Sequence, residues 1–510
     1  MARSSLVRRP WRGRHARRES ASLRGPLANW NNSIISRGET DRQMERSAER
    51  ALDLYTNDAM AHGVLETMLV EAVGIGHTPQ PSPKTSWLNL DVEWEDKFQD
   101  ASRRAWESWG LDCRNWCDAM SRLNIYGLQG LAYFDWRLFG IGVTQVVSRA
   151  DNLRPLSLAL LPISPFRLAT PSDATNADIY DGIEVDADGN PLAVWFRKPS
   201  EYLGTATTAN CTRIPYRDDA TGLPRILLTT DVRNVCEYRQ DSVLGPMLGE
   251  IRHSNDLAEA VVVGAMLRNL FTMFVQDYGA GAVDKNTPWH ERIIETEKGT
   301  ILAGGKNEKP IFFDHQAAPS GYGDLFSGII DRLGMSTGRG AENILRRFQA
   351  SYSASRANME KADQFNEREH MVLNNRFNQP VWSWMLYEEM LRGRLPVRSQ
   401  SDFLENLYGY TACEWLPQPF RHIDREKNAK ANALERQGGT LLLEDICGQR
   451  GRAWKDTLRK YAKELSFAKG LEDEFGVRLP LFAHLGIEDD PAASDTAQNN
   501  GSDNESTTSN

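Results

Sequence analysis

Apolar residues recur every three or four positions along several stretches of the chain, which is the spacing of one face of an α-helix. In the first 140 residues this spacing predicts four helices, over 30–52, 58–73, 93–109 and 115–139. Gly74, Gly76 and the following Pro79-Gln80-Pro81 end the second of them, because glycine and proline interrupt helices. The start of the chain therefore predicts a layer of helices.

Strand-forming residues replace this pattern in the next hundred positions. The segments 144–161 and 226–229 are rich in residues that favour strands. The runs 181–185 and 193–196 flank the turn sequence Asp188-Gly189-Asn190, which predicts a β-hairpin. With the preceding helices, these strands predict a mixed α+β domain over the first 240 residues.

A single long helix is predicted over 244–275, about 45 Å long at about 1.5 Å per residue. Its apolar residues form one stripe that a single subunit cannot cover. The stripe consists of Val263, Met266, Leu267, Leu270, Phe271 and Phe274. A compact insert follows, with a short helix predicted at 289–296 and strands at 300–303 and 309–313. Helices are predicted again over 325–333, 341–348 and 358–391.

The composition is that of a soluble globular protein, with 40% of the 510 residues hydrophobic and 25% charged. The longest apolar run, 257–274, includes Glu259, Arg268 and Asn269, and charged groups in mid-bilayer disfavour a membrane span. The Arg-rich start is not followed by the apolar segment of a secretory signal. We therefore expect cytoplasmic assembly and no membrane partner.

Charge is distributed unevenly along the chain. Residues 1–24 contain eight Arg and one Glu, a net charge of +7, so the remainder carries −16 when the total is −9. Residues 488–510 contain six acidic residues and no Lys or Arg, which predicts a disordered tail. The basic start, 1–28, predicts a flexible tail. It suits phosphate contacts with nucleic acid and docking on an acidic protein surface equally well.

Six cysteines are scattered over a chain too large to need disulfide bonds for stability, so we expect free thiols. Cys113 and Cys117 have the spacing of one helical turn, which would bring two thiolates to one face for a metal. No second Cys/His pair follows at the distance typical of a zinc finger. The spacing favours a structural role and leaves a metal site open.

The motifs of several enzyme classes are incomplete. Gly304-Gly305-Lys306-Asn307 lacks both the earlier Gly and the Ser or Thr after Lys that an ATP-binding loop needs. His290-Glu291 lacks the second His of a zinc protease, and no Gly-x-Ser-x-Gly sequence is present. Two-metal nucleases need clustered carboxylates, whereas Asp218-Asp219 and Asp489-Asp490 lie in a loop and at the edge of the acidic tail. We predict no catalytic residue, cofactor or metal.

Two short sequences carry a resemblance to a known family. Tyr352-Ser353-Ala354-Ser355-Arg356-Ala357 is similar to the Tyr-Ser-Ser-x-Arg-Ala segment of the lambda-type portal proteins of tailed phages, with Ala354 in place of the second Ser. The sequence from Asp424 resembles the family's Asp-Pro-x-Lys-Glu-Ala helix start, with Lys427 and Ala429 in register. Asp424 suits the N-cap of a helix that runs to about residue 436. The order and spacing of these motifs extend the resemblance over 29–475.

The resemblance implies an α+β fold of the portal type. Such a subunit has a mixed α/β wing, long stem helices, a small α/β clip and a tunnel loop, and it assembles into a ring. The implied parts are a basic tail 1–28, the wing 29–243, the first stem helix 244–276, the clip 277–318, the second stem region 319–348, the tunnel loop 349–358, a long helix 359–392, a C-terminal wing and crown region 393–487 and the acidic tail 488–510.

The resemblance also implies where this chain makes its contacts. The residues of the tunnel loop nearest DNA would be Tyr352, Ser353, Ser355 and Arg356, with Lys361 on the following helix. Trp289 and Glu291 would belong to the clip that docks partner proteins. Val263, Leu267, Phe271 and Phe274 would pack the stems of neighbouring subunits in the ring.

The implied function is that of a homododecameric portal ring at one capsid vertex, through which double-stranded DNA is packaged and ejected. The implied partners are the terminase large subunit, head-completion or connector proteins, and the major capsid and scaffold proteins. The implied location is the virion, after assembly in the host cytoplasm. From the residues alone, two alternatives stay open: a DNA-processing enzyme such as a nuclease or strand transferase, and a purely structural capsid or scaffold component.

Overall fold

The computed structural model describes residues 37–174, 178–199, 205–233, 237–270, 274–277, 308–311, 322–345, 352–417, 425–448, 450, 452 and 454–476. The chain divides into two compact units, Met1–Trp415 and Leu416–Asn510. This boundary lies later than the predicted start of the C-terminal region at residue 393. The reason is that strand β11 (Cys413–Leu416) pairs with β1 (Thr78–Pro81), near the beginning of the first unit.

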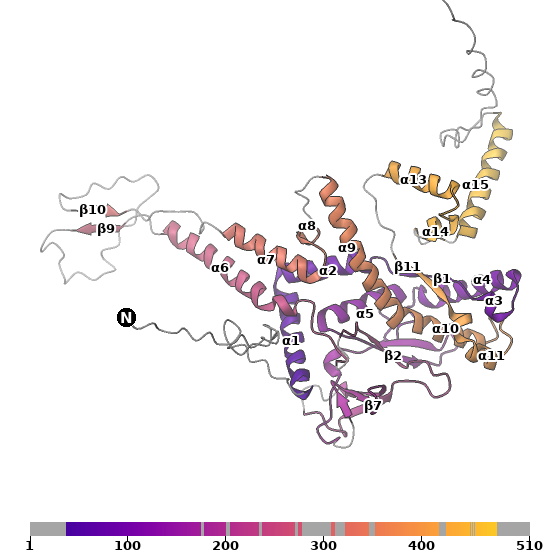
Figure 1. Cartoon of the computed structure of the whole chain (residues 1–510), viewed down its shortest axis with the longest axis horizontal. Coiled ribbons are helices and arrows are strands. Elements are labelled where there is room, and N and C mark those ends of the chain that lie inside the picture. Colours follow the sequence, from indigo (N-terminus) through magenta and orange to yellow (C-terminus); the bar gives the residue numbers. More distant parts are fainter. Residues whose placement is uncertain are drawn as a thin grey trace, which may run out of the picture. The chain divides into compact units, whose positions relative to one another are not determined.

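The first unit begins with the predicted layer of helices (Figure 1). These are α1 (Arg37–Asn57), α2 (Ala59–Ala72), α3 (Thr85–Leu88), α4 (Val92–Gly110) and α5 (Ile125–Phe139). Asp58, Asp91 and Asn124 stand directly before α2, α4 and α5, and each accepts a hydrogen bond from an amide of the first turn. These caps satisfy amides that have no partner inside the helix, and so fix where each helix begins.

The helix predicted over 115–139 begins only at α5, so the first ten residues of that prediction are wrong. Asp118 is buried, and its carboxylate accepts hydrogen bonds from the backbone amides of Met120, Arg122 and Leu123. A side chain that satisfies three amides locally competes with helical hydrogen bonding. The segment therefore forms turns.

Cys113 and Cys117 lie in these turns rather than on one face of a helix. Cys113 is exposed, whereas Cys117 is buried and contacts the carbonyl oxygens of Gly110 and Leu123. Burial raises the pKa of the Cys117 thiol to about 12. Within the described residues, no group of three or more His, Cys, Asp or Glu side chains is arranged to hold a metal ion.

Two antiparallel sheets follow the helices. The first has the strand order β3-β2-β8 and consists of β2 (Gly142–Ser148), β3 (Leu158–Pro162) and β8 (Ile226–Thr229). The second has the order β4-β5-β6-β7 and consists of β4 (Asp178–Tyr180), β5 (Ile183–Val185), β6 (Pro191–Arg197) and β7 (Cys211–Pro215). A short 3-10 helix, Pro165–Arg167, lies after β3.

The predicted hairpin is confirmed, because β5 and β6 pair in antiparallel register. Asp186 closes its turn by accepting hydrogen bonds from the amides of Asp188 and Asn190 at 3.0 and 2.8 Å. Gly189 adopts a φ of 86°, a left-handed conformation that glycine reaches without steric cost. The turn residues thus set the hairpin as the sequence pattern indicates.

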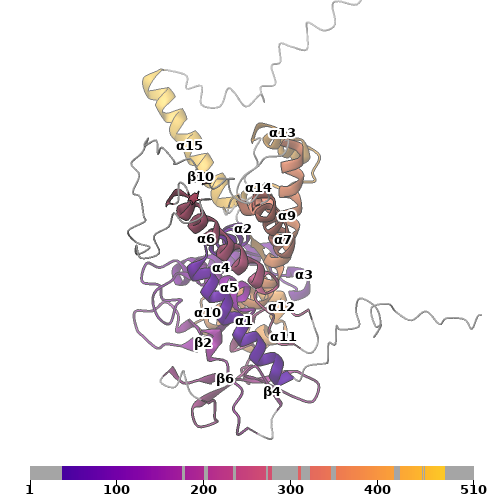
Figure 2. The same ribbon diagram turned by 90° about the vertical axis from the view of Figure 1, so that its left-hand side faces the viewer.

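The second half of the first unit is mainly helical (Figures 1 and 2). A 3-10 turn, Gly245–Met247, leads into α6 (Leu248–Leu270), and the chain continues through β9 (Phe274–Asp277), β10 (Glu308–Ile311), α7 (Tyr322–Thr337), α8 (Ala341–Leu345), α9 (Tyr352–Leu373), a π turn (Asn374–Asn378), α10 (Gln379–Leu391), α11 (Gln400–Glu405) and α12 (Leu407–Thr411). The long helix predicted over 358–391 is confirmed as α9, the π turn and α10.

A tryptophan cluster joins the two ends of the first unit in its main core. Trp106 of α4 packs edge-on against Trp382 of α10, with ring centroids 5.8 Å apart. Trp109 donates a hydrogen bond to the carbonyl oxygen of Leu158 in β3 at 2.9 Å. A second, smaller core lies between the two sheets. Since α4 and α10 are far apart in sequence, this packing fixes where the long helix α9–α10 crosses the domain.

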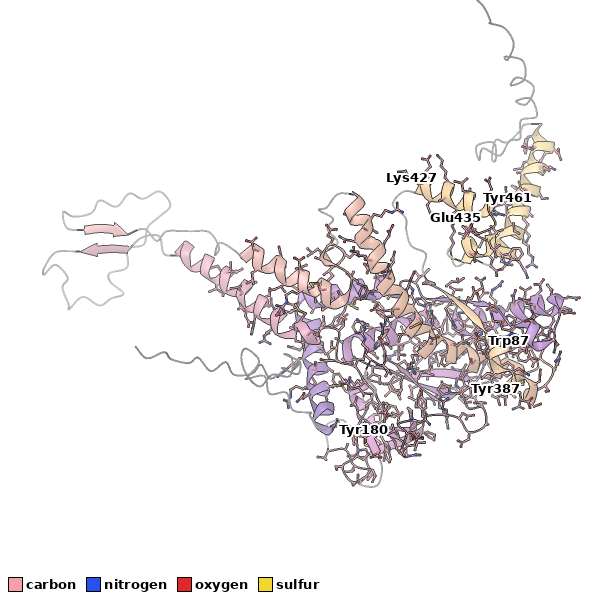
Figure 3. The ribbon with its side chains drawn as sticks, viewed as in Figure 1. Trp87, Tyr180, Tyr387, Lys427, Glu435 and Tyr461 are labelled. Atoms are coloured by element: carbon pink, nitrogen blue, oxygen red, sulfur yellow. The ribbon has the colours of Figure 1, made fainter. Side chains whose placement is uncertain are left out.

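The second unit contains α13 (Arg425–Gln437), α14 (Leu443–Gly448) and α15 (Trp454–Phe475). Figure 3 labels Lys427 and Glu435 on α13 and Tyr461 on α15. The helix predicted up to about residue 436 is confirmed as α13, while its predicted cap, Asp424, lies outside the described residues. Across the described parts of both units, no helix combines the length and apolar character needed to cross a membrane.

Candidate functional site

Helices α6 and α7 form a pair that precedes α8 and the start of α9, where the residues predicted to contact DNA lie (Figure 1). The two helices contact each other, and Arg332 of α7 forms an ion pair with Glu250 of α6 at 2.5 Å. Their bases are buried: Ile251 of α6 and Leu333 of α7 belong to the main core. The pair is therefore anchored at the end where α6 begins and α7 ends.

The distal half of α6 carries apolar side chains that the chain itself leaves in solvent. Val263 is 45% exposed and Met266 is 60% exposed. Leu267 lies in the same helix, although its side chain is outside the described set. Val263 and Leu267, which we predicted to pack between subunits, thus lie on a long helix, and the described side chain of Val263 is exposed. Their role in a ring stays a prediction.

The prediction that the stem helix continues to residue 275 is wrong. Helix α6 ends at Leu270, and Phe274 lies in strand β9, where it pairs with Ile311 of β10. Aromatic and β-branched residues such as Phe274 and Val275 favour a strand once a partner supplies backbone hydrogen bonds. That partner is remote in sequence, so helical spacing alone extended the helix too far. Phe271 lies outside the described residues.

Of the predicted clip, 277–318, the structure describes Asp277 and strand β10, which pairs with β9. Strand β10 confirms the strand predicted at 309–313 over Lys309–Ile311. Trp289 and Glu291, the residues predicted to dock partners, lie outside the described residues, as do the helix and the first strand predicted there.

The predicted tunnel loop is helical over most of its length. Helix α9 begins at Tyr352, so Tyr352, Ser353, Ser355 and Arg356 occupy its first turns, and a loop over 352–358 is wrong. Alanine, methionine, glutamate and lysine, which follow the Tyr-Ser start, are strong helix formers and explain the difference. The helix nevertheless starts with these residues, and whether they contact DNA stays a prediction.

The first turns of α9 present one buried and two exposed candidate side chains. Ser355 is buried, whereas Arg356 and Lys361 are exposed. Arg356 pairs with Glu360 one turn later, its Nε lying 3.0 Å from Oε1. Asn358 donates a hydrogen bond to Glu342 of α8 at 3.2 Å. The side chains of Tyr352 and Ser353 are not among those described.

A buried ionic cluster holds α9 and the α7–α8 turn on the helical layer, and the sequence analysis missed it. Arg339, in that turn, has a fully buried side chain. It pairs with Glu71 of α2 at 2.9 Å and with Glu369 of α9 at 2.6 Å, and it donates to Asn366 of α9 at 2.7 Å. Tyr133 of α5 donates to the same oxygen of Glu369 at 2.6 Å. Four elements meet at one guanidinium group.

The charges in this cluster stabilise one another. Burial alone would raise the pKa of Glu369, but Arg137, which lies 3.4 Å away, and Arg339 lower it below the usual value. Burial raises the pKa of Glu71, and Arg339 opposes that rise. Burial would lower the pKa of Arg339, and the oxygens of Tyr133, Glu369 and Glu71 raise it instead. The arginine therefore stays charged in the interior.

Two histidines lie next to this cluster: His370, near the end of α9, and His77, directly before β1. His77 contacts Asn374 of the π turn at 2.8 Å and the carbonyl oxygen of Ala72 at 2.9 Å through its two ring nitrogens. Its ring packs edge-on against His370, with centroids 4.8 Å apart. Burial, together with the neighbouring His77, lowers the pKa of His370 to about 4. Both rings are therefore neutral near pH 7.

One local signal for the cluster was present in the sequence. Arg339 stands between Gly338 and Gly340, and both glycines adopt a φ of 75°. An arginine between two glycines marks a tight, left-handed turn in which the backbone is held close to other elements. Its partners Glu71 and Glu369 are separated by almost three hundred residues, so no spacing rule connects them.

Comparison with known proteins identifies the family of this chain. The sequence model of the phage portal proteins of the lambda family matches residues 24–369, which is more than half of the chain. The chain belongs to the lambda family of phage portal proteins. The match covers α1 to α8 and ends at Glu369 of α9, so it includes the α6–α7 pair, the start of α9 and the buried cluster of this portal protein.

A search of solved structures matched chains from the gene transfer agent (GTA) particle. A chain from the neck of the native GTA particle, computed with C12 symmetry, is 12% identical with a TM-score of 0.38, and the alignment covers 76% of this chain and 98% of that one. A chain from the neck of the empty GTA particle, computed with C6 symmetry, is 12% identical with a TM-score of 0.42, covering 84% and 97%. A chain from the virion of the native gene transfer agent particle is 12% identical with a TM-score of 0.36, and the alignment covers 74% of this chain and 94% of that one. A search of curated proteins found no match.

Proposed function

We propose that twelve copies of this portal protein form a closed ring at one vertex of a capsid, and that double-stranded DNA passes through the ring during packaging and ejection. The observation that carries the proposal is the family match over the stem helices, together with apolar side chains on α6 that the subunit leaves exposed. The ring number is the one that the family resemblance implies. In this proposal the ring assembles in the host cytoplasm and lies in the finished virion.

The exposed face of α6 is the proposed contact between neighbouring subunits. Burying a side chain such as Met266 against another apolar surface contributes about 1.5–3 kcal/mol. In a closed ring the same contact repeats at every interface, so each apolar position acts many times. Leu325 and Met335 of α7 are also exposed, so the neighbouring helix offers further apolar side chains for contact with another subunit.

The first turns of α9 are the proposed wall of the DNA channel. Arg356 and Lys361 are exposed there and carry positive charge in a chain whose formal charge is −9. Each fixed phosphate contact strengthens DNA binding, so a channel through which DNA slides should offer few of them. Tyr352, Ser353 and Ser355 complete the proposed channel segment.

The segment around β9 and β10 is the proposed clip, residues 277–318. In this proposal Trp289 and Glu291 dock the terminase large subunit during packaging and the head-completion or connector proteins afterwards. Wing residues 29–243 and the C-terminal region 393–487 then face the major capsid and scaffold proteins. The proposal includes no catalytic residue and no cofactor.

Ring formation can be tested with one substitution and a matched control. Met266→Glu places a carboxylate in the proposed apolar interface, where burying an unpaired charge costs several kcal/mol at each copy of the contact. Val92→Glu adds the same charge at an exposed apolar position at the start of α4, outside α6 and α7. By light scattering and negative-stain imaging, we expect rings with a central hole from the unmodified protein and from Val92→Glu, and subunits or fragments from Met266→Glu.

Two results would contradict the proposal in different ways. If the unmodified protein forms no ring at any concentration tested, the proposed function fails. If Met266→Glu forms rings of unchanged mass, the ring stands and α6 is not its interface.

A further inference from the structure

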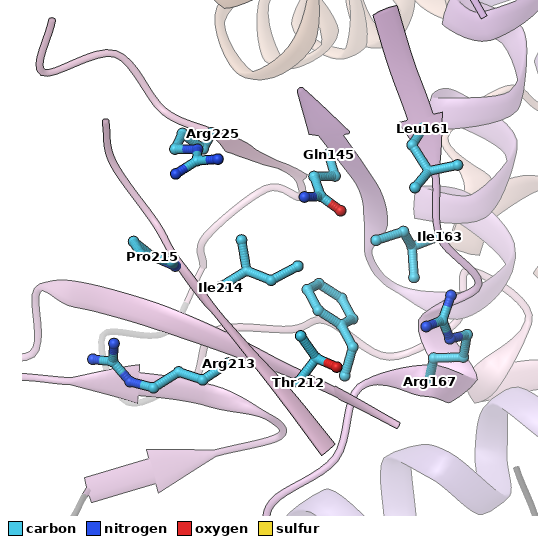
Figure 4. A pocket seen from close by; sticks show the side chains of 10 residues that line it. Gln145, Leu161, Ile163, Arg167, Thr212, Arg213, Ile214, Pro215 and Arg225 are labelled. Carbon is cyan, nitrogen blue, oxygen red and sulfur yellow. The ribbon is translucent and has the colours of Figure 1, made fainter. Parts of the chain in front are cut away.

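We propose that a pocket between the two sheets of the first unit captures an extended acidic peptide of a partner protein, which adds a strand to the free edge of β7. This inference goes beyond the channel and does not depend on ring formation. The pocket has a volume of about 420 Å³ and is open to solvent. Figure 4 shows it between β7 on one side and β2 and β3 on the other.

The position of the pocket along β7 is the first step. Four consecutive residues of this strand, Thr212 to Pro215, line it. Successive side chains of a strand point to opposite faces of the sheet, so a cavity lined by four in a row follows the edge of the strand rather than one face. β7 is the outermost strand in the order β4-β5-β6-β7, so no described strand covers that edge.

The backbone of β7 has hydrogen-bonding groups to offer on this edge. The amide of Tyr216 donates to Leu192 at 2.9 Å, and the amide of Lys198 donates to Asn210 at 3.0 Å. In an antiparallel pair the hydrogen-bonded positions alternate, so these two bonds leave Arg213 at a position whose N–H and C=O point away from β6. An added strand pairs with these groups.

The pocket combines an apolar floor with a cationic rim. Leu161, Phe196 and Ile214 supply apolar surface. Arg167, Arg213 and Arg225 supply positive charge, and no acidic residue lines the pocket. Arg213 pairs with Glu184 at 2.7 Å, whereas the half-buried side chain of Arg225 has no hydrogen-bond or ion-pair partner in the described part of the chain.

The chemistry of the occupant follows from this arrangement. A strand bound at the edge of β7 alternates its side chains, so apolar residues meet Phe196 and Ile214 while the residues between them point to the rim. Carboxylates at those positions pair with Arg225 and Arg213, since arginine forms strong hydrogen bonds with carboxylates. A DNA duplex offers phosphates to the arginines but nothing apolar to the floor and no strand edge to β7. An acidic peptide that alternates with apolar residues fits all three features.

The binding test uses the full chain and synthetic probes. The first probe is a fluorescein-labelled ten-residue peptide that alternates Glu or Asp with Leu or Ile, followed by fluorescence anisotropy. The second carries Lys in place of every acidic residue, and the third is the acidic peptide with N-methyl groups on the amides of one edge and then of the other. We expect binding of the acidic probe, no binding of the lysine probe, and a loss of about tenfold or more when the paired edge is methylated.

Two substitutions and a control locate the site. Arg225→Glu reverses the unpaired rim charge, and Ile214→Glu places a carboxylate on the floor. Arg149→Glu makes the same charge change at an exposed position after the end of β2 and outside the pocket. We expect Arg225→Glu and Ile214→Glu to weaken the acidic probe by about tenfold or more, and Arg149→Glu to change it less than about twofold. Arg225 lies at the rim, so its variant reports on binding even if the floor variant fails to fold.

Several results would overturn the proposal. One is absence of binding by the acidic probe. A second is equal binding when either edge is N-methylated, because strand addition requires one edge. A third is equal loss from Arg149→Glu and Arg225→Glu. The last is displacement of the probe by a 20-base-pair DNA duplex in the unmodified protein but not in Arg225→Glu, which would assign the pocket to nucleic acid.

Discussion

Arg339 carries a positive charge into the interior of the first unit, where Glu71, Asn366 and Glu369 surround it. Replacing it by Met leaves the half-buried Glu71 without a cation and the buried Glu369 with Arg137 alone, and breaking such an ion pair costs about 3–5 kcal/mol. We expect Arg339→Met to lower the free energy of unfolding by about that amount, measured by urea denaturation.

The matched control for Arg339→Met is Arg332→Met. Arg332 pairs with Glu250 at 2.5 Å but lies mostly in solvent, and exposed pairs contribute about 0–1 kcal/mol. If the two substitutions cost the same, the buried cluster does not hold α9 and the α7–α8 turn in the way described.

His370 predicts a pH dependence of stability. Its pKa is lowered from 6.5 to about 4 in the folded chain, first by burial and then by His77. Below pH 6.5 the unfolded chain takes up a proton that the folded chain does not, so stability is lost as the pH falls from 6.5 towards 4. We expect His370→Phe, which keeps an aromatic ring beside His77, to reduce the drop in melting temperature between pH 7 and pH 4.5. An unchanged drop would mean that other groups set the acid sensitivity.

Elements were predictable from the sequence to the extent that their determinants are local. The helical spacing of α2 and α4 and the turn chemistry of the β5–β6 hairpin lie within a few residues, and the structure confirms these three predictions. Several limits were wrong, among them the starts of α5 and α9 and the end of α6. Helix α5 begins late because the Asp118 carboxylate binds backbone amides before it, and α6 ends early because Phe274 pairs with a strand more than thirty residues away. Helical spacing shows neither contact.

The candidate site divides in the same way. The exposed residues Val263, Arg356 and Lys361 could be proposed from the stripe and from the family motif, because both are local sequence features. The cluster around Arg339 could not, since it brings together α2, α5, α9 and the α7–α8 turn through tertiary packing. The pocket beside β7 is similarly invisible in sequence, because its two walls belong to different sheets.

The turn between α7 and α8 gives a test at the scale of elements. Gly338 and Gly340 share a φ of 75°, but a Cβ on Gly338 would lie 2.3 Å from the ring of Phe365 in α9, and one on Gly340 would meet nothing within 4 Å. Both substitutions by Ala carry the cost of a left-handed backbone, about 1–2 kcal/mol. Only Gly338→Ala must also displace α9 or the Phe365 ring.

We therefore expect Gly338→Ala to destabilise the protein more than Gly340→Ala, by about 1 kcal/mol or more. Urea denaturation of the two variants measures this difference in the free energy of unfolding. Equal losses would show that Phe365 rotates aside freely and that the turn does not set the position of α9.

At the scale of the whole molecule, charge separates the conduit from the segment that we propose touches DNA. Each subunit has a formal charge of −9, so in the ring that we propose the accumulated negative charge would repel a duplex. Arg356, within the family motif, and Lys361, four residues beyond it, are exposed near the start of α9. If this segment lines the bore, their repetition around the ring makes a positive collar in an acidic channel.

Arg356→Glu tests this collar. In the subunit, Arg356 pairs with the exposed Glu360 at 3.0 Å, and reversing one charge of an exposed i, i+4 pair costs about 0.2–0.5 kcal/mol. The ring should therefore assemble normally. DNA passage should suffer, and we expect procapsids that recruit the packaging motor and hydrolyse ATP but retain much less nuclease-resistant DNA.

The matched control is Lys97→Glu, which reverses one charge of another exposed i, i+4 pair, Lys97 with Glu93 at 2.7 Å on α4. It changes the net charge of the ring by the same amount but lies outside the proposed channel segment, so packaging should be normal. Equal packaging by Arg356→Glu and Lys97→Glu would remove Arg356 from the DNA path. Failure of Arg356→Glu to form a ring would instead place Arg356 at a contact between subunits, because an exposed intrahelical pair is too weak to decide assembly.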